Sequence, residues 1–406
     1  MLAHAAMNFV APKTEAETVE AVNAVRSARQ KIAIRGGGTR AGLGRPVEAE
    51  TQLSTRGLTG ITLYEPSELV ISARAGTPLS EIETALQEKN QTLPFEPMDH
   101  RALYGTSGEP TIGGIAACNI SGPRRISAGA ARDLLIGLRF VNGRGEIVKT
   151  GGRVMKNVTG LDLVKLLCGG HGTLGIITEA TFKVLPHPAF AGTLALYGLA
   201  DGEAVAALCA AQGTPLSISA AAHLPAGLAT PEPLTLFRLE GPQASVDERL
   251  SALRRTLAPF ESGEALAPDY AGALWRAICN VVPLVSPPDA AIWRVSIQPT
   301  RAPKFVDLVL RQLPARYYYD WGGGLVWLSI AAAGDAGGAI IRGALKEAGN
   351  GQTIGHGILV RAPEDVRSRV NVFEPLSLPL HKLTKDIKSS FDPDGILNPG
   401  RMYAGI

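Results

Sequence analysis

The stretch KIAIRGGGTRAGLG, residues 31–44, decides how the rest of this sequence is interpreted. Residues 31–35 alternate and include two isoleucines, which predicts a short strand. The three glycines at 36–38 then end the strand, and without Cβ atoms they let the backbone adopt left-handed conformations and approach a ligand closely. Successive N–H groups in such a turn form a concave nest that suits a phosphate or diphosphate. Charged, hydroxyl and further glycine residues border this nest: Arg35, Thr39, Arg40, Gly42 and Gly44.

A glycine-rich hairpin is the alternative explanation of this stretch taken alone. Two familiar nucleotide-binding loops do not fit it. A Walker loop needs Lys followed by Ser or Thr after the last glycine, and a Rossmann loop needs G-x-G-x-x-G running into a helix. Here Arg45, Pro46 and polar residues follow instead. The stretch therefore predicts a diphosphate nest outside a doubly wound sheet.

Length and composition indicate a globular protein of two or three domains. The chain has 406 residues, of which 45% are hydrophobic and 19% charged. A net charge of +3 without a Lys/Arg block argues against nucleic acid as a partner. The four cysteines are far apart and form no disulfide framework, which suits a reducing compartment: Cys118, Cys168, Cys209 and Cys279.

Targeting signals are not convincing. The first ten residues lack the basic start and long apolar run of a signal peptide. Residues 204–231 carry no Asp, Glu, Lys or Arg, but three prolines interrupt them, which excludes a transmembrane helix. We expect a soluble, cytoplasmic protein with no transmembrane segment, one that reaches the inner membrane only through a partner.

Strands and helices alternate through the first part of the chain. Thr14 and Glu17 form a capping-box pattern ahead of valines at helical spacing. Residues 69–73 predict a second strand, and Pro78 at a first helical position predicts the helix that follows it. Residues 178–184 predict a further strand.

Three more segments are rich in glycine and other small residues: GEPTIGGIAACNISGPRR at 108–125, GGHGTLGII at 169–177 and DPDGILNPGR at 392–401. Small residues let a backbone pass close to a flat ligand. For residues 108–125 alone, a tightly packed buried helix or loop explains the pattern equally well.

Taken together, the four segments resemble, in order and spacing, the PCMH-type FAD-binding domain of the vanillyl-alcohol-oxidase family. The similarity is greatest to the FAD-binding E-type subunits of bacterial glycolate oxidase. It is close over residues 30–190, including VMKN at 154–157, and over 388–406, and looser between them. The resemblance implies an α+β fold. A two-lobed FAD-binding domain at 1–189, completed by a return segment at 388–406, would carry a smaller α+β cap domain at 190–387.

The resemblance also implies non-covalent FAD, because residues 37–39 occupy the place where some relatives carry a flavin-linking His or Cys. The cofactor-binding residues that it implies are Arg35, Gly36, Gly37, Gly38, Thr39, Arg40, Gly42, Leu43, Gly44, Pro97, Thr111, Ile112, Gly113, Gly114, Ala117, Asn119, Ser121, Gly122, Gly175, Ile176, Ile177, Asn398 and Arg401.

The middle of the chain shows a different pattern of predicted helices and strands. Helical patterns at 245–257 and 303–313 interleave with strand-like runs, which predicts an antiparallel sheet with helices on one side. The strand-like runs are 192–198, 233–239, 292–297, 325–330 and 352–360. In the resembling family this domain caps the isoalloxazine and shapes the substrate pocket.

Oxidation of a 2-hydroxy acid needs a base for the hydroxyl proton and a cation for the carboxylate, and flavin carries the redox step. His356 and His381 are the candidate bases, and Arg294 or Arg361 the candidate cation; a surface or structural role is the alternative for each. Catalytic relatives carry an H-x-G-D-G-N stretch that helps bind metal and substrate. Residues 355–358 lack its Asp and Asn, which argues against independent catalysis by this chain. We expect no metal site.

Three functional hypotheses follow. The first is an FAD-binding subunit of a glycolate oxidase, which turns glycolate into glyoxylate with a catalytic FAD (D-type) subunit and an iron–sulfur (F-type) subunit that receives the electrons. The second is an accessory interaction subunit with a non-catalytic flavin site. The third is a stand-alone FAD-dependent 2-hydroxy-acid dehydrogenase.

Overall fold

The computed structural model describes residues 7–152 and 161–406, so the VMKN stretch lies outside the described residues. The chain begins with a parallel three-stranded sheet in the order β1-β3-β2. Helix α1 connects its strands, and the Thr14 hydroxyl accepts the Glu17 N–H at 3.1 Å, which confirms the predicted cap. The bounds are β1 (Asn8–Val10), α1 (Glu15–Ser27), β2 (Ile32–Arg35) and β3 (Thr51–Ser54).

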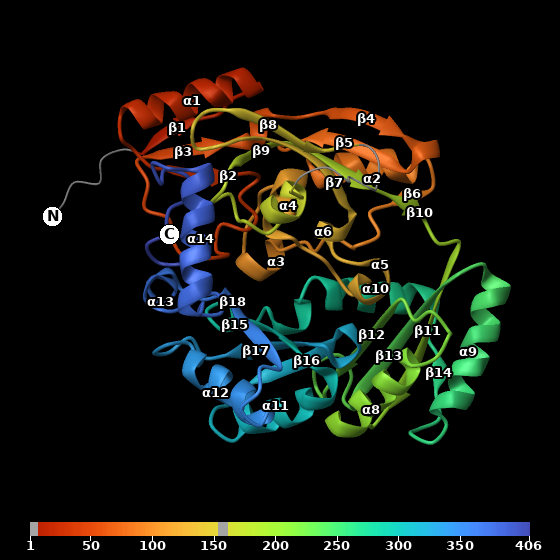
Figure 1. Cartoon of the computed structure of the whole chain (residues 1–406). Coiled ribbons are helices and arrows are strands. Elements are labelled where there is room, and N and C mark those ends of the chain that lie inside the picture. Colours follow the sequence, from red (N-terminus) through yellow and green to blue (C-terminus); the bar gives the residue numbers. More distant parts are fainter. Residues whose placement is uncertain (1–6, 153–160) are drawn as a thin grey trace.

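A five-stranded antiparallel sheet in the order β4-β5-β9-β7-β8 forms the second lobe. Short helices lie between this sheet and the rest of the molecule (Figure 1). The predicted strands at 69–73 and 178–184 and the helix after Pro78 are confirmed as β5, β9 and α2. The elements are β4 (Ile61–Glu65), β5 (Val70–Arg74), α2 (Leu79–Gln87), β6 (Gln91–Thr92), α3 (Arg101–Tyr104), α4 (Ile112–Cys118), α5 (Arg125–Ala128), α6 (Ala131–Leu134), β7 (Leu135–Val141), β8 (Ile147–Gly151), α7 (Leu163–Leu167), β9 (Ile176–Lys183) and β10 (Leu185–Pro186).

An antiparallel eight-stranded sheet forms the cap, in the order β14-β11-β13-β12-β16-β17-β15-β18. Its strands are β11 (Phe190–Tyr197), β12 (Ala220–Leu224), β13 (Leu234–Gly241), β14 (Glu264–Ala265), β15 (Ala291–Ile297), β16 (Arg316–Asp320), β17 (Leu325–Ile330) and β18 (Gly355–Arg361). The predicted antiparallel α+β architecture is confirmed. The sequence missed β12, because it lies in the proline-interrupted uncharged run.

Helices cover both faces of the cap sheet rather than the one that the sequence predicted. On the outer face lie α8 (Asp201–Gln212), α9 (Gln243–Leu257), α11 (Ala302–Leu310) and α12 (Gly338–Ala348), and on the inner face lies α10 (Pro268–Cys279). Trp275 and Ile278 of α10 pack into the same buried cluster as Phe95 and Phe182 of the FAD-binding lobe. The cap and the part of the chain before it therefore share one continuous core.

The end of the chain returns to its beginning. Helix α13 (Glu364–Arg369) and helix α14 (Leu378–Phe391) lead the chain from the cap back to the first sheet (Figure 1). There Leu397 pairs with Ile32 in a parallel bridge, which extends the sheet beyond β2. The division of the chain at 189 and 387 remains a prediction.

Candidate cofactor site

A cavity of about 350 Å³ opens where β2 ends, between the two lobes and the returning chain. Fourteen of the twenty-three predicted cofactor residues line it: Arg35, Gly36, Gly37, Gly38, Thr39, Arg40, Thr111, Gly113, Gly114, Ala117, Gly175, Ile177, Asn398 and Arg401. These residues come from all four small-residue segments of the sequence. The fold thus brings the four motifs to one wall, as expected of a single binding site.

Backbone donors form the floor of this cavity. None of the N–H groups of residues 36–40 donates a hydrogen bond to another described residue. Of the three glycines at 36–38, Gly38 adopts φ +81°, the left-handed conformation that a nest requires. Unpaired N–H groups next to a cavity cost free energy unless water or a ligand accepts them. This row of donors therefore matches a diphosphate.

Gly37 serves a different purpose. A Cβ on Gly37 would lie 1.5 Å from the carbonyl oxygen of Glu109, and a Cβ on Gly108 would lie 1.9 Å from the oxygen of Gly37. The first glycine loop and the loop before α4 are thus packed backbone against backbone. The absence of a side chain at Gly37 allows this loop-to-loop contact, in addition to any contact with a ligand.

Positive charge dominates the cavity wall. Among the described lining residues four are arginines and one, Glu364, is a carboxylate. The sequence placed Arg40 at the rim, but its side chain is buried: Nε donates to His100 Nδ1 at 3.1 Å and Nη2 to the Met98 carbonyl at 2.9 Å. Burial lowers the pKa of Arg40 and of Arg401, yet both remain charged at neutral pH. The wall is therefore electrostatically suited to an anion.

His171 is a lining residue that the sequence analysis did not assign to the site. Its Nδ1 is buried without a hydrogen-bond partner, and burial lowers the pKa of His171 to about 3. Its ring is neutral at physiological pH and packs against Phe373 with centroids 5.0 Å apart. The sequence signal that could have assigned His171 to the site is its place within the third glycine-rich segment, residues 169–177. His171 lines the cavity, and a buried ring nitrogen without a protein partner is expected to find one in a ligand or in water.

Glu364 and Arg367 of α13 are two more lining residues that the sequence did not suggest. Arg367 donates to the carbonyl oxygens of Gly44 and Ala362, at 2.7 and 3.0 Å. It thereby holds the exit of the first glycine loop against the cap. No motif surrounds these residues, because only the return of the chain brings α13 to the cavity.

Asn398 connects the returning chain to the site. Its Oδ1 accepts the Ile34 N–H and its Nδ2 donates to the His171 carbonyl oxygen, both at 2.8 Å. The segment that carries Asn398 is fixed by a buried ion pair, Lys388 with Asp392, at 2.6 Å. Lys388 also donates to carbonyl oxygens on both sides, those of Thr173 and Leu397. The ion pair thus locks the third and fourth small-residue segments together.

Nine predicted cofactor residues do not line the cavity: Gly42, Leu43, Gly44, Pro97, Ile112, Asn119, Ser121, Gly122 and Ile176. Several have structural contacts instead. Gly42 faces the ring of Tyr104, and Leu43, Ile112 and Ile176 are buried in the core. Asn119 ends α4 with φ +51°, and the Ser121 hydroxyl accepts the Ala131 N–H. Their contact with FAD remains a prediction.

None of the four candidate catalytic residues lines this cavity. His381 is exposed on α14, and Arg361 donates to four backbone carbonyl groups. Arg294 and His356 lie instead on the inner face of the cap sheet, on the neighbouring strands β15 and β18. Burial lowers the pKa of His356, so its imidazole is neutral at pH 7. No group of three or more His, Cys, Asp or Glu in the described part of the chain is arranged to hold a metal ion.

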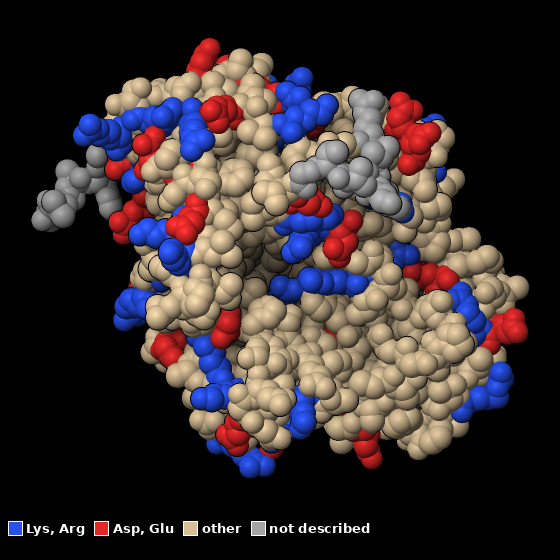
Figure 2. All heavy atoms as spheres, in the orientation of Figure 1, with Lys and Arg blue, Asp and Glu red and all other residues tan. Residues whose placement is uncertain are grey.

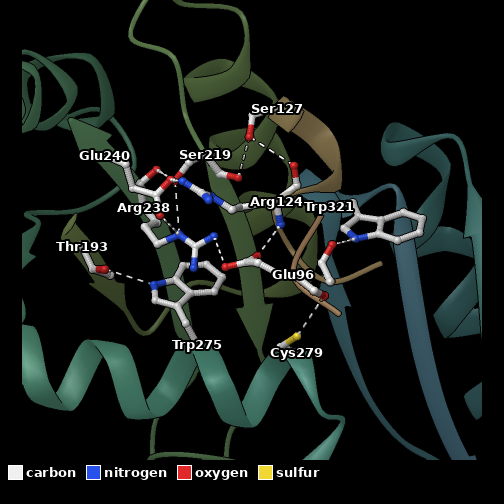
Figure 3. Close-up of polar contacts among 11 residues, drawn as sticks. Glu96, Arg124, Ser127, Thr193, Ser219, Arg238, Glu240, Trp275, Cys279 and Trp321 are labelled. Carbon is white, nitrogen blue, oxygen red and sulfur yellow. Dashed lines mark hydrogen bonds and ion pairs between the residues drawn. The ribbon is translucent and has the colours of Figure 1, made fainter. Parts of the chain in front are cut away.

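Polar contacts fasten the cap to residues 121–125, which follow α4 (Figure 3). Arg238 of β13 forms an ion pair with Glu96 at 2.8 Å, and Arg124 forms one with Glu240 at 2.5 Å. The indole N–H of Trp321 donates to the Gly122 carbonyl at 3.1 Å. The segment after α4 is thus held in place by the cap as well as by its own lobe.

These features fit FAD. The row of free N–H groups and the arginines suit its diphosphate, and the small residues of α4 leave room for a flat group beside them. A Cβ on Gly114 would lie 3.2 Å from Thr111 Oγ1 and 3.6 Å from Arg40 Nη1, in space that the cavity now occupies. Residues 36–40, Thr111, His171 and Asn398 would hold the dinucleotide.

Comparison with known proteins agrees with this assignment. A family model described as an FAD binding domain matches residues 6–151. The chain is 37% identical over 389 residues to the glycolate oxidase subunit GlcE of Escherichia coli (strain K12), covering 96% of this chain and 97% of that protein. It is 32% identical over 233 residues to the glycolate oxidase subunit GlcD of Bacillus subtilis (strain 168), covering 57% and 46%. A D-lactate dehydrogenase of Archaeoglobus fulgidus is 33% identical over 187 residues, covering 45% and 40%.

Solved structures share the fold at low identity. A p-cresol methylhydroxylase with substrate bound superposes with a TM-score of 0.75 at 15% identity, covering 98% of this chain and 88% of that one. A 4-ethylphenol oxidase from Gulosibacter chungangensis gives 0.72 at 13% identity, covering 98% and 89%. No helix within the described ranges is both long and apolar enough to span a membrane. The near full-length similarity to GlcE and the FAD-binding domain show that the chain belongs to the E-subunit family of glycolate oxidase, a family of FAD-dependent oxidoreductases.

Proposed function

We propose that this chain is the FAD-binding subunit of a complex that oxidises glycolate to glyoxylate. Its partners are a catalytic FAD subunit of the D type and an iron–sulfur subunit of the F type, which receives the electrons. The observation that carries the proposal is the similarity to GlcE over 96% of the chain. A cytoplasmic location, with the inner membrane reached only through the complex, is part of the same proposal.

The flavin supplies the redox chemistry when bound. The protein supplies binding and orientation: the donors of residues 36–40 hold the diphosphate, and the neutral His171 ring offers Nδ1 to the cofactor. The small-residue helix α4 lies along it, with Gly113 and Gly114 on the cavity wall. The return segment, fixed by Lys388, closes the site on the remaining side.

An accessory role without catalysis in this chain is the second candidate function. It is favoured by the placement of the candidate bases, because neither His356 nor His381 lies at the described cavity wall. In this case the electrons would leave the hydroxy acid on the D-type subunit, and the flavin held here would have another role or none.

Turnover of the separate and combined subunits tests these alternatives. Glycolate-dependent reduction of an artificial dye is measured for this chain alone, for the D-type and F-type pair, and for all three. We expect the chain alone to be at least about a hundredfold slower than the complex, because a misplacement of about 1 Å in a site can cost that much.

Three results would change the assignment. A purified chain without flavin, in a complex that retains full activity, would support the accessory role. Full activity of the D-type and F-type pair without this chain would overturn the proposal. A chain that alone matches the rate of the complex would be a stand-alone dehydrogenase.

A further inference from the structure

Two arginines in the contact region between the lobe and the cap differ from the others inside the protein. Arg361 and Arg367 donate to backbone carbonyl groups, and Arg238 and Arg124 have carboxylate partners. Arg125 and Arg294 donate no hydrogen bond to a described residue, and neither forms an ion pair there. A partly buried guanidinium with five N–H donors and no protein acceptor leaves those donors to solvent or to a ligand.

Both arginines lie against one aromatic ring. The guanidinium carbon of Arg125 is 4.5 Å from the ring centroid of Trp321, and that of Arg294 is 4.9 Å from it. Arg125 begins α5 on the FAD-binding side, whereas Arg294 and Trp321 belong to the cap. The indole N–H bond to Gly122 fixes the ring between the two parts, as the labelled side chain in Figure 3 shows. Tertiary contacts between the cap and the FAD-binding side therefore bring Arg125 and Arg294 to the same ring.

Strand register places Arg294 on the face of the cap sheet that looks toward the lobe. It pairs with Trp327 of β17 and with Ile358 of β18, and directly paired residues share a face. Ile292, two positions earlier and on the same face, packs into the core that the two parts share. Arg294 thus points into the junction, toward the segment that carries Arg125.

The surroundings of Arg294 are positively charged. Burial, and then the charge of Arg125, lower the pKa of Arg294 to about 10, although its side chain keeps partial contact with solvent. Figure 2 shows a hollow between lobe and cap, with Lys and Arg side chains gathered along one rim. The acid that most affects Arg294 is Asp320, which is buried and accepts the Trp321 N–H instead. Like charges this close favour an anion between them.

We propose that Arg125 and Arg294, which both lie against the ring of Trp321, form a binding site for a small monocarboxylate. The planar guanidinium groups would take the two carboxylate oxygens. The anion follows from the geometry. Its identity as a 2-hydroxy carboxylate such as glycolate rests on the proposed function.

Glycolate binding to the full-length, FAD-loaded chain tests the site. Binding is followed by calorimetry and by the change in flavin absorbance, with glycolamide as a neutral ligand of the same shape and inorganic phosphate as a competing anion. Glycolate should bind more tightly than either. Arg125→Gln and Arg294→Gln should each weaken glycolate binding by about 10- to 100-fold, the usual effect of losing hydrogen bonds to a charged group.

Two further variants keep the test decisive. Arg255→Gln, on the exposed face of α9, removes one positive charge away from the site and should leave glycolate binding unchanged. Arg125→Lys keeps the positive charge but loses the planar, two-pronged donor group of arginine. Its affinity for glycolate should therefore lie between those of the wild type and Arg125→Gln. If Arg294→Gln does not fold, the two Arg125 variants decide the outcome by themselves.

The inference and the proposed function fail in different ways. Wild-type affinity for glycolate in a folded, yellow Arg125→Gln variant overturns the site, as does equal binding of glycolamide or tighter binding of phosphate. Absence of glycolate binding by the wild-type chain, in a complex that oxidises glycolate, also overturns the site alone. Intact binding in a complex without glycolate oxidation supports the site and overturns the proposed function.

Discussion

The cofactor cavity and the arginine pair at Trp321 are both suited to anions, but they are built from different parts of the chain. The cavity floor consists of backbone N–H groups, so its sequence signature is the absence of side chains at residues 36–38. The arginine pair depends on side chains from two elements that are 169 positions apart, Arg125 and Arg294. Backbone sites require glycines in a contiguous run, whereas side-chain sites require only that the fold bring single residues together. The first kind can be recognised in a sequence, and the second has no local pattern.

The largest expected effect concerns how the cavity holds its flavin. All of the flavin should leave the protein on acid precipitation, because residues 37–39 offer no linking side chain. Cys118 and His171 do line the cavity, but burial raises the pKa of the Cys118 thiol, which leaves it a poor nucleophile. The measurement is flavin absorbance in the supernatant and the pellet. Flavin retained in the pellet would contradict non-covalent binding and point to one of these two residues.

Gly114→Val should reduce FAD affinity by about a hundredfold, the upper range of overpacking effects in a tight site. A Cβ at this position, on the cavity wall, would meet no backbone atom outside its own helix within 4 Å. Gly37→Val would instead meet the Glu109 carbonyl and disturb the loop itself. Flavin content and FAD titration of the apoprotein give the measurement.

Gly343→Val is the matched control for Gly114→Val, because it is also a helical glycine and its Cβ would meet nothing within 4 Å. Normal flavin content in Gly114→Val, with a normal Tm, would show that FAD does not pass along α4.

Lys388→Met should destabilise the protein by about 3–5 kcal/mol, because it leaves the buried Asp392 without its cation. FAD affinity should fall as well, since the segment carrying Asn398 is no longer fixed. Urea unfolding measures the free energy, and Lys385→Met, on the exposed side of the same helix, is the control. A loss below about 1 kcal/mol would mean that the return segment is held by other contacts.

His171→Phe should weaken FAD binding by about 2- to 12-fold, the equivalent of one net hydrogen bond. Phenylalanine keeps the aromatic contact with Phe373 but removes the unpartnered Nδ1. His187→Phe, at an exposed position, serves as the control, and FAD titration of the apoproteins gives the affinities. Unchanged affinity would show that Nδ1 does not face the cofactor.

The last prediction concerns the pH dependence of stability at Asp320, beside the arginine pair. Burial raises the pKa of Asp320 to about 7, above its value in the unfolded chain. Folding therefore favours the protonated acid, and the stability it contributes at low pH is lost as the pH rises through 7. Asp320→Asn stays neutral, so its Tm should gain on the wild type between pH 5 and pH 8. Asp386→Asn, at an exposed position, should show no such gain.

The secondary structure of the FAD-binding half could largely be predicted, because its signals are local. Each of these signals acts within a few residues: the helix N-cap at Thr14, the strand before the glycines, and the proline at the start of α2. The secondary structure of the cap domain was harder to predict. Strand β12 contains no alternation to detect, since all five of its residues are buried on both faces. Helix α10 was missed, and with it the inner-face layer that joins the two parts.

The sequence by itself indicated the cofactor: the glycines at 36–38 predict a diphosphate nest, and the four small-residue segments resemble, in order and spacing, a known FAD-binding domain. The tertiary structure decided which other side chains belong to the site. His171, Arg367 and the arginine pair at Trp321 reach their places through the return of the chain and the docking of the cap. The physical reason is that a hydrogen bond or ion pair depends on distance in space, and the fold alone converts distant positions in the sequence into neighbours.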